Sequence, residues 1–93
     1  MDVRGVKGPY NPTDLPAWAR AQLEIASSIV DNPGGGLLFA TQAIGQVKAA
    51  LQEHGEEHYA EVVETLDRAE DSAIKREFEA ATKLIGEAIA RLS

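Results

Sequence analysis

Two histidines at the ends of one short segment are the side chains whose type and spacing could do chemistry. The segment from His54 to His58 runs His-Gly-Glu-Glu-His and fits the pattern His-x-x-Glu-His. In that pattern both histidines bind zinc from one helical face, and the glutamate acts as a general base. Gly55 stands inside the motif at a predicted helix end, which would spoil the spacing, and no third ligand is recognisable. We therefore predict a polar turn without a metal ion, with a small metal-binding protein using His54 and His58 as an alternative.

The run of glycines from Gly34 to Gly36 precedes a predicted helix and could hold an anion on free backbone amides. A phosphate-binding loop of the Walker type needs lysine followed by serine or threonine at this point, whereas Leu37 and Leu38 stand there. No predicted strand precedes the glycines. We interpret the run as a flexible link between two helices.

No other group of side chains indicates catalysis. The serines and threonines have no histidine and acid at a suggestive spacing, although a triad is assembled by the fold and sequence alone does not exclude one. Most acidic residues lie on predicted helix exteriors within reach of a base, as on a solvated face. We predict that the protein is not an enzyme and binds no cofactor.

The composition is that of one small acidic domain. The chain has 93 residues, 44% of them hydrophobic, no cysteine and a formal net charge of −6. An acidic surface repels phosphate backbones and anionic membranes, and no apolar run approaches the roughly 18 residues of a membrane span. No signal peptide is evident, so we expect a cytoplasmic protein without membrane or nucleic-acid partners. A small nucleic-acid-binding regulator with a basic N-terminal segment is the alternative.

The elements that must position these residues are all predicted to be helical, so the expected fold class is all-α. Residues 1–12 are rich in glycine and proline and are expected to form a flexible arm before a single helical domain, 13–93. Apolar residues at helical spacing predict a first helix over 13–31 and a second over 37–54. The second is apolar around most of its circumference, which indicates a central helix covered on several sides.

The last 38 residues, from Glu56 onward, contain no proline and a single glycine, Gly86. Acid–base pairs four residues apart continue through this stretch, as on a solvated helical ridge. We therefore favour one long helix over 57–92, which makes a three-helix bundle. The alternative is a break near Asp71, where Asp71 or Ser72 could cap a fourth helix.

Two apolar stripes on this stretch are rotated from each other by roughly 80° at 100° per residue. A straight helix about twice as long as its neighbours would leave part of the second stripe uncovered, and an uncovered stripe is usually an interface. We predict a non-enzymatic protein–protein interaction, assembly or regulatory module that forms a homodimer through its C-terminal helix. The predicted interface residues are Phe78, Ile85, Ile89 and Leu92.

Overall fold

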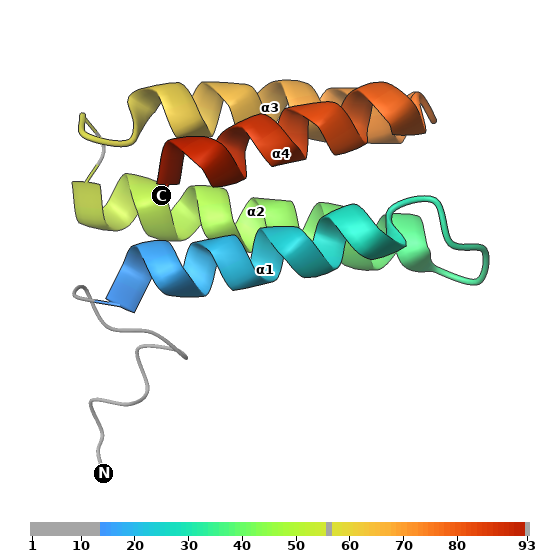
Figure 1. The fold of residues 1–93 in the computed structure, drawn as a ribbon, viewed down its shortest axis with the longest axis horizontal. Helices are drawn as coiled ribbons and strands as arrows, with labels where there is room; N and C mark the ends of the chain where they lie inside the picture. Colours follow the sequence, from blue (N-terminus) through green and yellow to red (C-terminus); the bar gives the residue numbers. More distant parts are fainter. Residues whose placement is uncertain (1–13, 56, 93) are drawn as a thin grey trace, which may run out of the picture.

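Four helices make up the part of the chain that the structure, a computed structural model, describes, which is residues 14–55 and 57–92 (Figure 1). They are α1 (Leu15–Ile29), α2 (Gly36–Gly55), α3 (Ala60–Ile74) and α4 (Phe78–Leu92). These residues include no strand, which confirms the all-α class. The predicted arm, residues 1–12, lies outside the described residues.

Each helix packs against two others, and together they enclose an apolar core. α1 contacts α2 and α4, and α3 contacts the same two helices. Figure 1 shows α1 and α2 as one antiparallel pair, with α3 and α4 as a second antiparallel pair lying against it. Alanine is the commonest core residue, so the helices can approach closely but bury little volume per residue. The largest fully buried side chains come from all four helices: Leu15, Leu23, Ile44, Leu51, Leu66 and Ile85.

The first two helices lie close to their predicted bounds. Pro16 occupies the first turn of α1, where its missing amide hydrogen is not needed. Asp14 stands at the N-cap position, but its side chain makes no capping hydrogen bond. α2 begins one residue earlier and ends one residue later than predicted, at Gly55. No helix among the described residues combines the length and the apolarity that crossing a membrane requires.

The link between α1 and α2 needs glycine for two separate reasons. Gly34 and Gly35 have φ angles of 81° and 109°, in the left-handed region that residues with a side chain rarely adopt. Gly36 has an ordinary φ angle, but a Cβ atom there would collide with the carbonyl oxygen of Ile29. Its amide donates to the carbonyl oxygen of Asn32 at 3.2 Å, so this amide of the glycine run already has a partner within the chain.

The predicted single helix over 57–92 is wrong, because the chain turns back at Lys75 to Glu77 and forms two helices. Arg76 takes a left-handed conformation with a φ angle of 64°. Its amide donates to the carbonyl oxygen of Ala73 at 2.9 Å, and the amide of Glu77 donates to that of Ser72 at 2.8 Å. These two bonds form the Schellman motif that ends many helices, here with arginine where glycine is usual. The break lies a few residues beyond the alternative position near Asp71.

Packing explains why the chain turns back without glycine or proline. A left-handed residue with a side chain costs about 1–2 kcal/mol. Burying one large aliphatic side chain contributes about 1.5–3 kcal/mol, and α4 buries Ile85 and Leu92 together with Ala81 and Ala88. The rotation between the two stripes therefore lets α3 and α4 share one core after the turn, and this gain exceeds the cost of the turn.

Candidate functional site

Four large apolar side chains are more than half exposed near one end of the molecule. The exposed fractions are 54% for Ile25, 61% for Leu38, 64% for Phe39 and 62% for Ile74. Leu38 and Phe39 lie in the first turn of α2, Ile25 lies in the second half of α1, and Ile74 ends α3. The α1–α2 link and the α3–α4 turn lie at this end, on the right in Figure 1. We call these four residues the apolar patch.

Helical geometry places Ile25 and Phe39 on either side of the groove between α1 and α2. The Arg20 guanidinium donates to the carbonyl oxygen of Leu92 at 2.9 Å, so this side of α1 faces α4. Ile25, five residues later, is rotated about the helix axis by about 140° from Arg20. The buried stripe of α1 lies between these two directions, so Ile25 is on the side of α1 toward α2. Lys48 faces α3, and Phe39, nine residues before it, is rotated by about 180°, toward α1. The two side chains therefore flank one groove.

The same reasoning places Leu38 on the outer face of α2 and Ile74 on the side of α3 that faces α2. Leu38 is rotated by about 80° from Lys48 and about 100° from Phe39, so it points between these two directions, away from the core. Glu70 faces α2, and Ile74, four residues later, is rotated from it by only about 40°. The apolar patch is thus a band over three helices with the start of α2 in its middle. The expectation that α2 is covered on several sides is wrong at Leu38 and Phe39.

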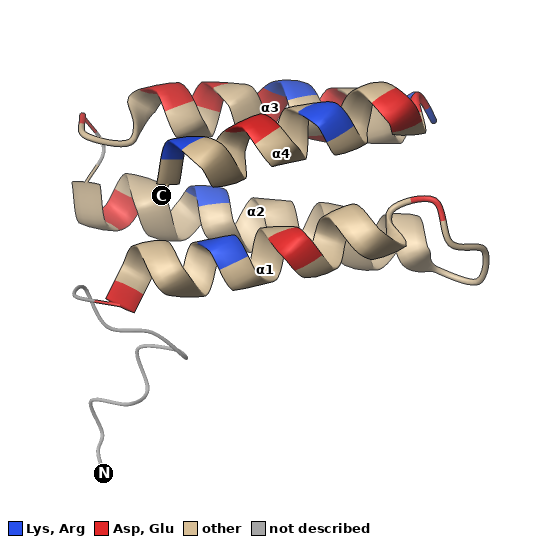
Figure 2. Cartoon of the chain, in the orientation of Figure 1, with Lys and Arg blue, Asp and Glu red and all other residues tan. Residues whose placement is uncertain are grey.

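Charge is distributed unevenly between the two helix pairs, as Figure 2 shows. α1 and α2 carry two residues each of the types Asp, Glu, Lys and Arg, whereas α3 carries six and α4 carries four. Within α1 and α2, Arg20 faces α4 and Lys48 faces α3, so neither points into the groove between Ile25 and Phe39. The other two charged residues of this pair, Glu24 and Glu53, are exposed, and Glu53 lies near the opposite end of α2. Leu38 and Phe39 therefore have no charged residue near them on their own helix.

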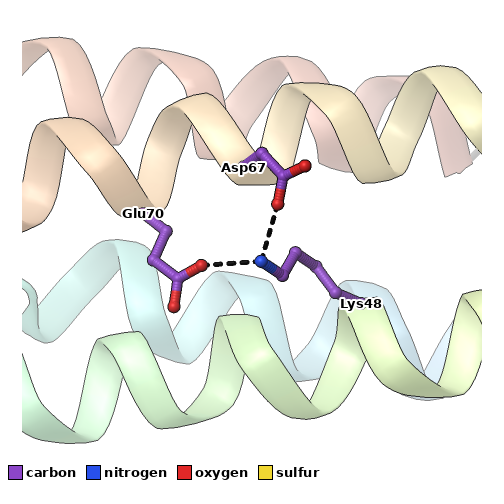
Figure 3. A network of polar contacts seen from close by, with 3 residues as sticks. All are labelled: Lys48, Asp67 and Glu70. Atoms are coloured by element: carbon purple, nitrogen blue, oxygen red, sulfur yellow. Dashed lines mark hydrogen bonds and ion pairs between the residues drawn. The ribbon is translucent and has the colours of Figure 1, made fainter.

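A lysine held by two carboxylates joins α2 to α3 (Figure 3). The Lys48 ammonium lies 2.6 Å from Oδ1 of Asp67 and 2.7 Å from Oε1 of Glu70. The hydrogen bonds that the ammonium donates to these carboxylates, to Asp67 first, raise the pKa of Lys48 above its usual 10.5. A lysine that acts as a base or nucleophile needs a lowered pKa, so this network ties two helices together and does not prepare a reactive amine.

The two histidines of the alternative metal-binding hypothesis, His54 and His58, lie on different elements. His54 is in the last turn of α2, whereas His58 follows the end of that helix and precedes α3. The ring of His58 lies edge-on to Tyr59, with 4.7 Å between ring centroids. The described residues hold no group of three or more metal-ligating side chains. The helical spacing that the zinc motif needs is lost because α2 ends at Gly55.

A hollow of about 580 Å³ lies where the turn before α3 meets the end of α4. Its lining includes His58, Glu61 and Arg91, and Arg91 is paired there with Glu61 at 2.6 Å. Arg91 thus pairs across to α3, although Glu87 stands four residues before it on α4. Because the guanidinium is already neutralised, the hollow offers little to an anion.

No family model, curated protein or solved structure matches this chain. Function is therefore inferred from the geometry of the described residues. Within that geometry, the apolar patch is the feature that normal packing of a small domain leaves unexplained, because large apolar side chains gathered in one place usually mark an interaction site.

The residues predicted to form an interface lie against this chain's own helices. Ile85 has no exposed surface and Leu92 is 6% exposed, while Phe78 and Ile89 pack against the core and are partly buried. These residues were predicted to be exposed to a partner because a straight helix would extend beyond its neighbours. The turn at Arg76 removes that extension. Among residues 14–55 and 57–92, the large apolar side chains that are exposed are instead Ile25, Leu38, Phe39 and Ile74.

Proposed function

We propose that this protein is a non-enzymatic interaction module that self-associates through the apolar patch. The observation that carries the proposal is the cluster of Ile25, Leu38, Phe39 and Ile74 around the first turn of α2, each side chain more than half exposed. Exposed residues of this size are common singly but mark interfaces when they gather. Covering them with another protein surface gains hydrophobic free energy that one chain alone cannot gain.

A second copy of the chain can cover the apolar patch without bringing the most charged surfaces together. Each copy has a formal net charge of −6, and most charged residues lie on α3 and α4. A contact centred on the start of α2 leaves the solvent-facing charged side chains of α3 and α4 largely uncovered, and so limits both desolvation and repulsion. A two-fold axis through the patch buries the same residues on both copies, which is the commonest closed arrangement.

Light scattering at a series of protein concentrations tests this proposal. We expect the molar mass of the wild-type protein to rise from one chain toward two, and Phe39→Asp to weaken the dimer by at least tenfold. Gln52→Asp is the matched control, since it adds the same charge to an exposed position of the same helix. It lies 13 residues away, or about 20 Å, and should leave dimerisation unchanged. Circular dichroism should show that both variants keep their helices.

Two results would reject the proposal. The first is a wild-type protein that stays monomeric up to concentrations of about 1 mM, because a Kd above this value corresponds to less than about 4 kcal/mol of association free energy. The second is an equal loss of dimer in Phe39→Asp and Gln52→Asp. That result would show a general charge effect and no role for the patch.

A further inference from the structure

The turn between α3 and α4 has the properties of a hinge held in a strained conformation. Its three residues, Lys75, Arg76 and Glu77, are all exposed. Arg76 is in the left-handed region, with a φ angle of 64°, although it carries a side chain. None of the three residues is glycine or proline, so each can adopt a helical conformation without difficulty. Straightening the turn would remove the strained conformation, and short strained connections favour exchange of elements between copies.

Ile74 is the second observation that points to a straight form. It ends α3, where it is 62% exposed. In sequence it stands four residues before Phe78 and 11 residues before Ile85, which is the spacing of the apolar stripe on α4. In a continuous helix Ile74 would join that stripe, whereas the turn places it outside the core. The pair Asp71–Lys75, 3.1 Å apart, has the four-residue spacing that a continuous helix also allows.

We propose that the second copy binds by exchanging α4. In the exchanged dimer the segment 75–77 is helical, α3 and α4 form one rod, and α4 of each copy occupies the place of α4 in the other. Ile85 and Leu92 keep the same surroundings, now supplied by the partner's α1 and α3. The exchanged dimer therefore preserves the core contacts of each four-helix unit. It differs from two monomers mainly at residues 75–77.

The location of the apolar patch agrees with this arrangement. Leu38, Phe39 and Ile74 lie at the end of the molecule that contains the turn (Figure 1). In the exchanged dimer the α3–α4 rod runs through this end of one copy into the second copy. The ends that contain residues 75–77 in the two monomers therefore face each other, and the two apolar patches come closer together. This inference rests on the proposed self-association and specifies how it occurs.

Two substitutions of Arg76 test the role of the hinge. Arg76→Gly and Arg76→Ala both remove the guanidinium, but glycine tolerates the left-handed conformation and alanine does not. Alanine also favours a continuous helix. We expect Arg76→Gly to weaken the dimer by about tenfold. Arg76→Ala keeps the cost that arginine already carries and gains only helix propensity, so it should strengthen the dimer by about twofold. Molar mass measured against concentration gives both values. Equal effects of the two substitutions would overturn the proposed hinge.

Cross-linking between chains tests the exchange itself. Glu61 and Arg91 lie next to each other across α3 and α4, 2.6 Å apart, and the chain has no cysteine of its own. One chain carrying Glu61→Cys and another carrying Arg91→Cys are unfolded together, refolded as a mixture and treated with a short bifunctional thiol reagent. An exchanged dimer brings the two cysteines together and gives a covalent pair of chains. At a concentration where the protein is monomeric, a single chain with both substitutions should be linked internally. A chain with Glu61→Cys alone should give no covalent pair.

The results separate this inference from the proposed function. Covalent pairs in the mixture that Arg76→Gly reduces support exchange of α4. A dimer that depends on Phe39 but gives no cross-chain product overturns the exchange and leaves self-association through the patch intact. A protein that stays monomeric, as wild type and as Arg76→Ala, overturns both.

Discussion

The amide of Glu77 donates a 2.8 Å hydrogen bond to the carbonyl oxygen of Ser72 and closes α3 around Arg76. Arg76 occupies a position where glycine is strongly favoured, because the left-handed conformation brings the Cβ atom of any other residue close to the backbone.

We therefore predict that Arg76→Gly stabilises the monomer by about 1 kcal/mol, which is the cost of a left-handed residue with a side chain. Urea unfolding at a concentration where the protein is monomeric measures the change. Arg76→Ala keeps the conformational cost and should alter the free energy of unfolding by less than about 0.5 kcal/mol. Equal stabilities of the glycine and alanine variants would contradict the assigned conformation of Arg76.

Glycine-to-alanine substitutions should divide into two classes by their surroundings. At Gly45 and Gly86, inside α2 and α4, an added Cβ meets no atom within 4 Å. Alanine at either position should stabilise the protein by about 0.5–1 kcal/mol through its higher helix propensity. At Gly36 the Cβ would collide with the carbonyl oxygen of Ile29, so Gly36→Ala should be destabilising by more than about 1 kcal/mol. Thermal unfolding of the three variants checks the order, and a stabilising Gly36→Ala would disprove the close approach.

The network around Lys48 should make stability depend on pH in the alkaline range. The folded-state pKa of Lys48 is raised above 10.5 by hydrogen bonds to Asp67 and then Glu70. Its stabilising contribution is therefore complete below pH 10.5 and is lost as the pH rises through the higher folded-state value. Lys48→Met lacks this contribution, so its free energy of unfolding should fall less than that of the wild type above pH 10.5.

The size of the Lys48 contribution should be modest. Asp67 is 59% exposed and Glu70 is 29% exposed, so solvent weakens the first pair more than the second. We expect Glu70→Gln to cost about 0.5–1 kcal/mol and Asp67→Asn to cost less. A double-mutant cycle with Lys48→Met, measured by urea unfolding at pH 7, separates each pairing from other effects of the substitutions. A larger coupling for Asp67 than for Glu70 would contradict this order.

Added salt should strengthen the proposed dimer. Two chains with a formal net charge of −6 each repel one another, and the Debye length falls from about 30 Å at 0.01 M to about 10 Å at 0.1 M ionic strength. The apolar contact itself is not weakened by this change. Sedimentation at the two ionic strengths should therefore show a dimerisation constant several-fold larger in the higher salt. A decrease with salt would indicate that ion pairs, and not Leu38 and Phe39, hold the copies together.

The sequence predicted the all-α class and the first two helices well, because apolar residues at helical spacing and a run of glycines define them. It did not locate the turn at Arg76, because the residue in the left-handed conformation is not glycine and the neighbouring residues all favour a helix. The rotation between the two apolar stripes did carry a signal, since two helices that fold back can bury both stripes while one straight helix cannot. The interface prediction at Ile85 and Leu92 depended on the straight helix and has lost that support.

The exposed patch was also present in the sequence pattern. Leu37, Leu38 and Phe39 are consecutive, and at about 100° per residue three neighbours cannot all face one core. Leu37 is partly buried against the core, while the other two point outward. The pairings of Lys48 and of Arg91 could not be predicted, because their partners depend on how separate helices align in space.

The start of α1 and the end of α4 lie together at one end of the molecule, and the turn at Arg76 lies at the other (Figure 1). A fluorescent protein or affinity tag joined near either of those helix ends therefore sits about one helix length, roughly 22 Å, from Leu38 and Phe39. The same proximity suits circular permutation: a short peptide could connect the end of α4 to the start of α1, with new termini opened at Arg76. Such a permuted chain would keep all four helices without the strained connection.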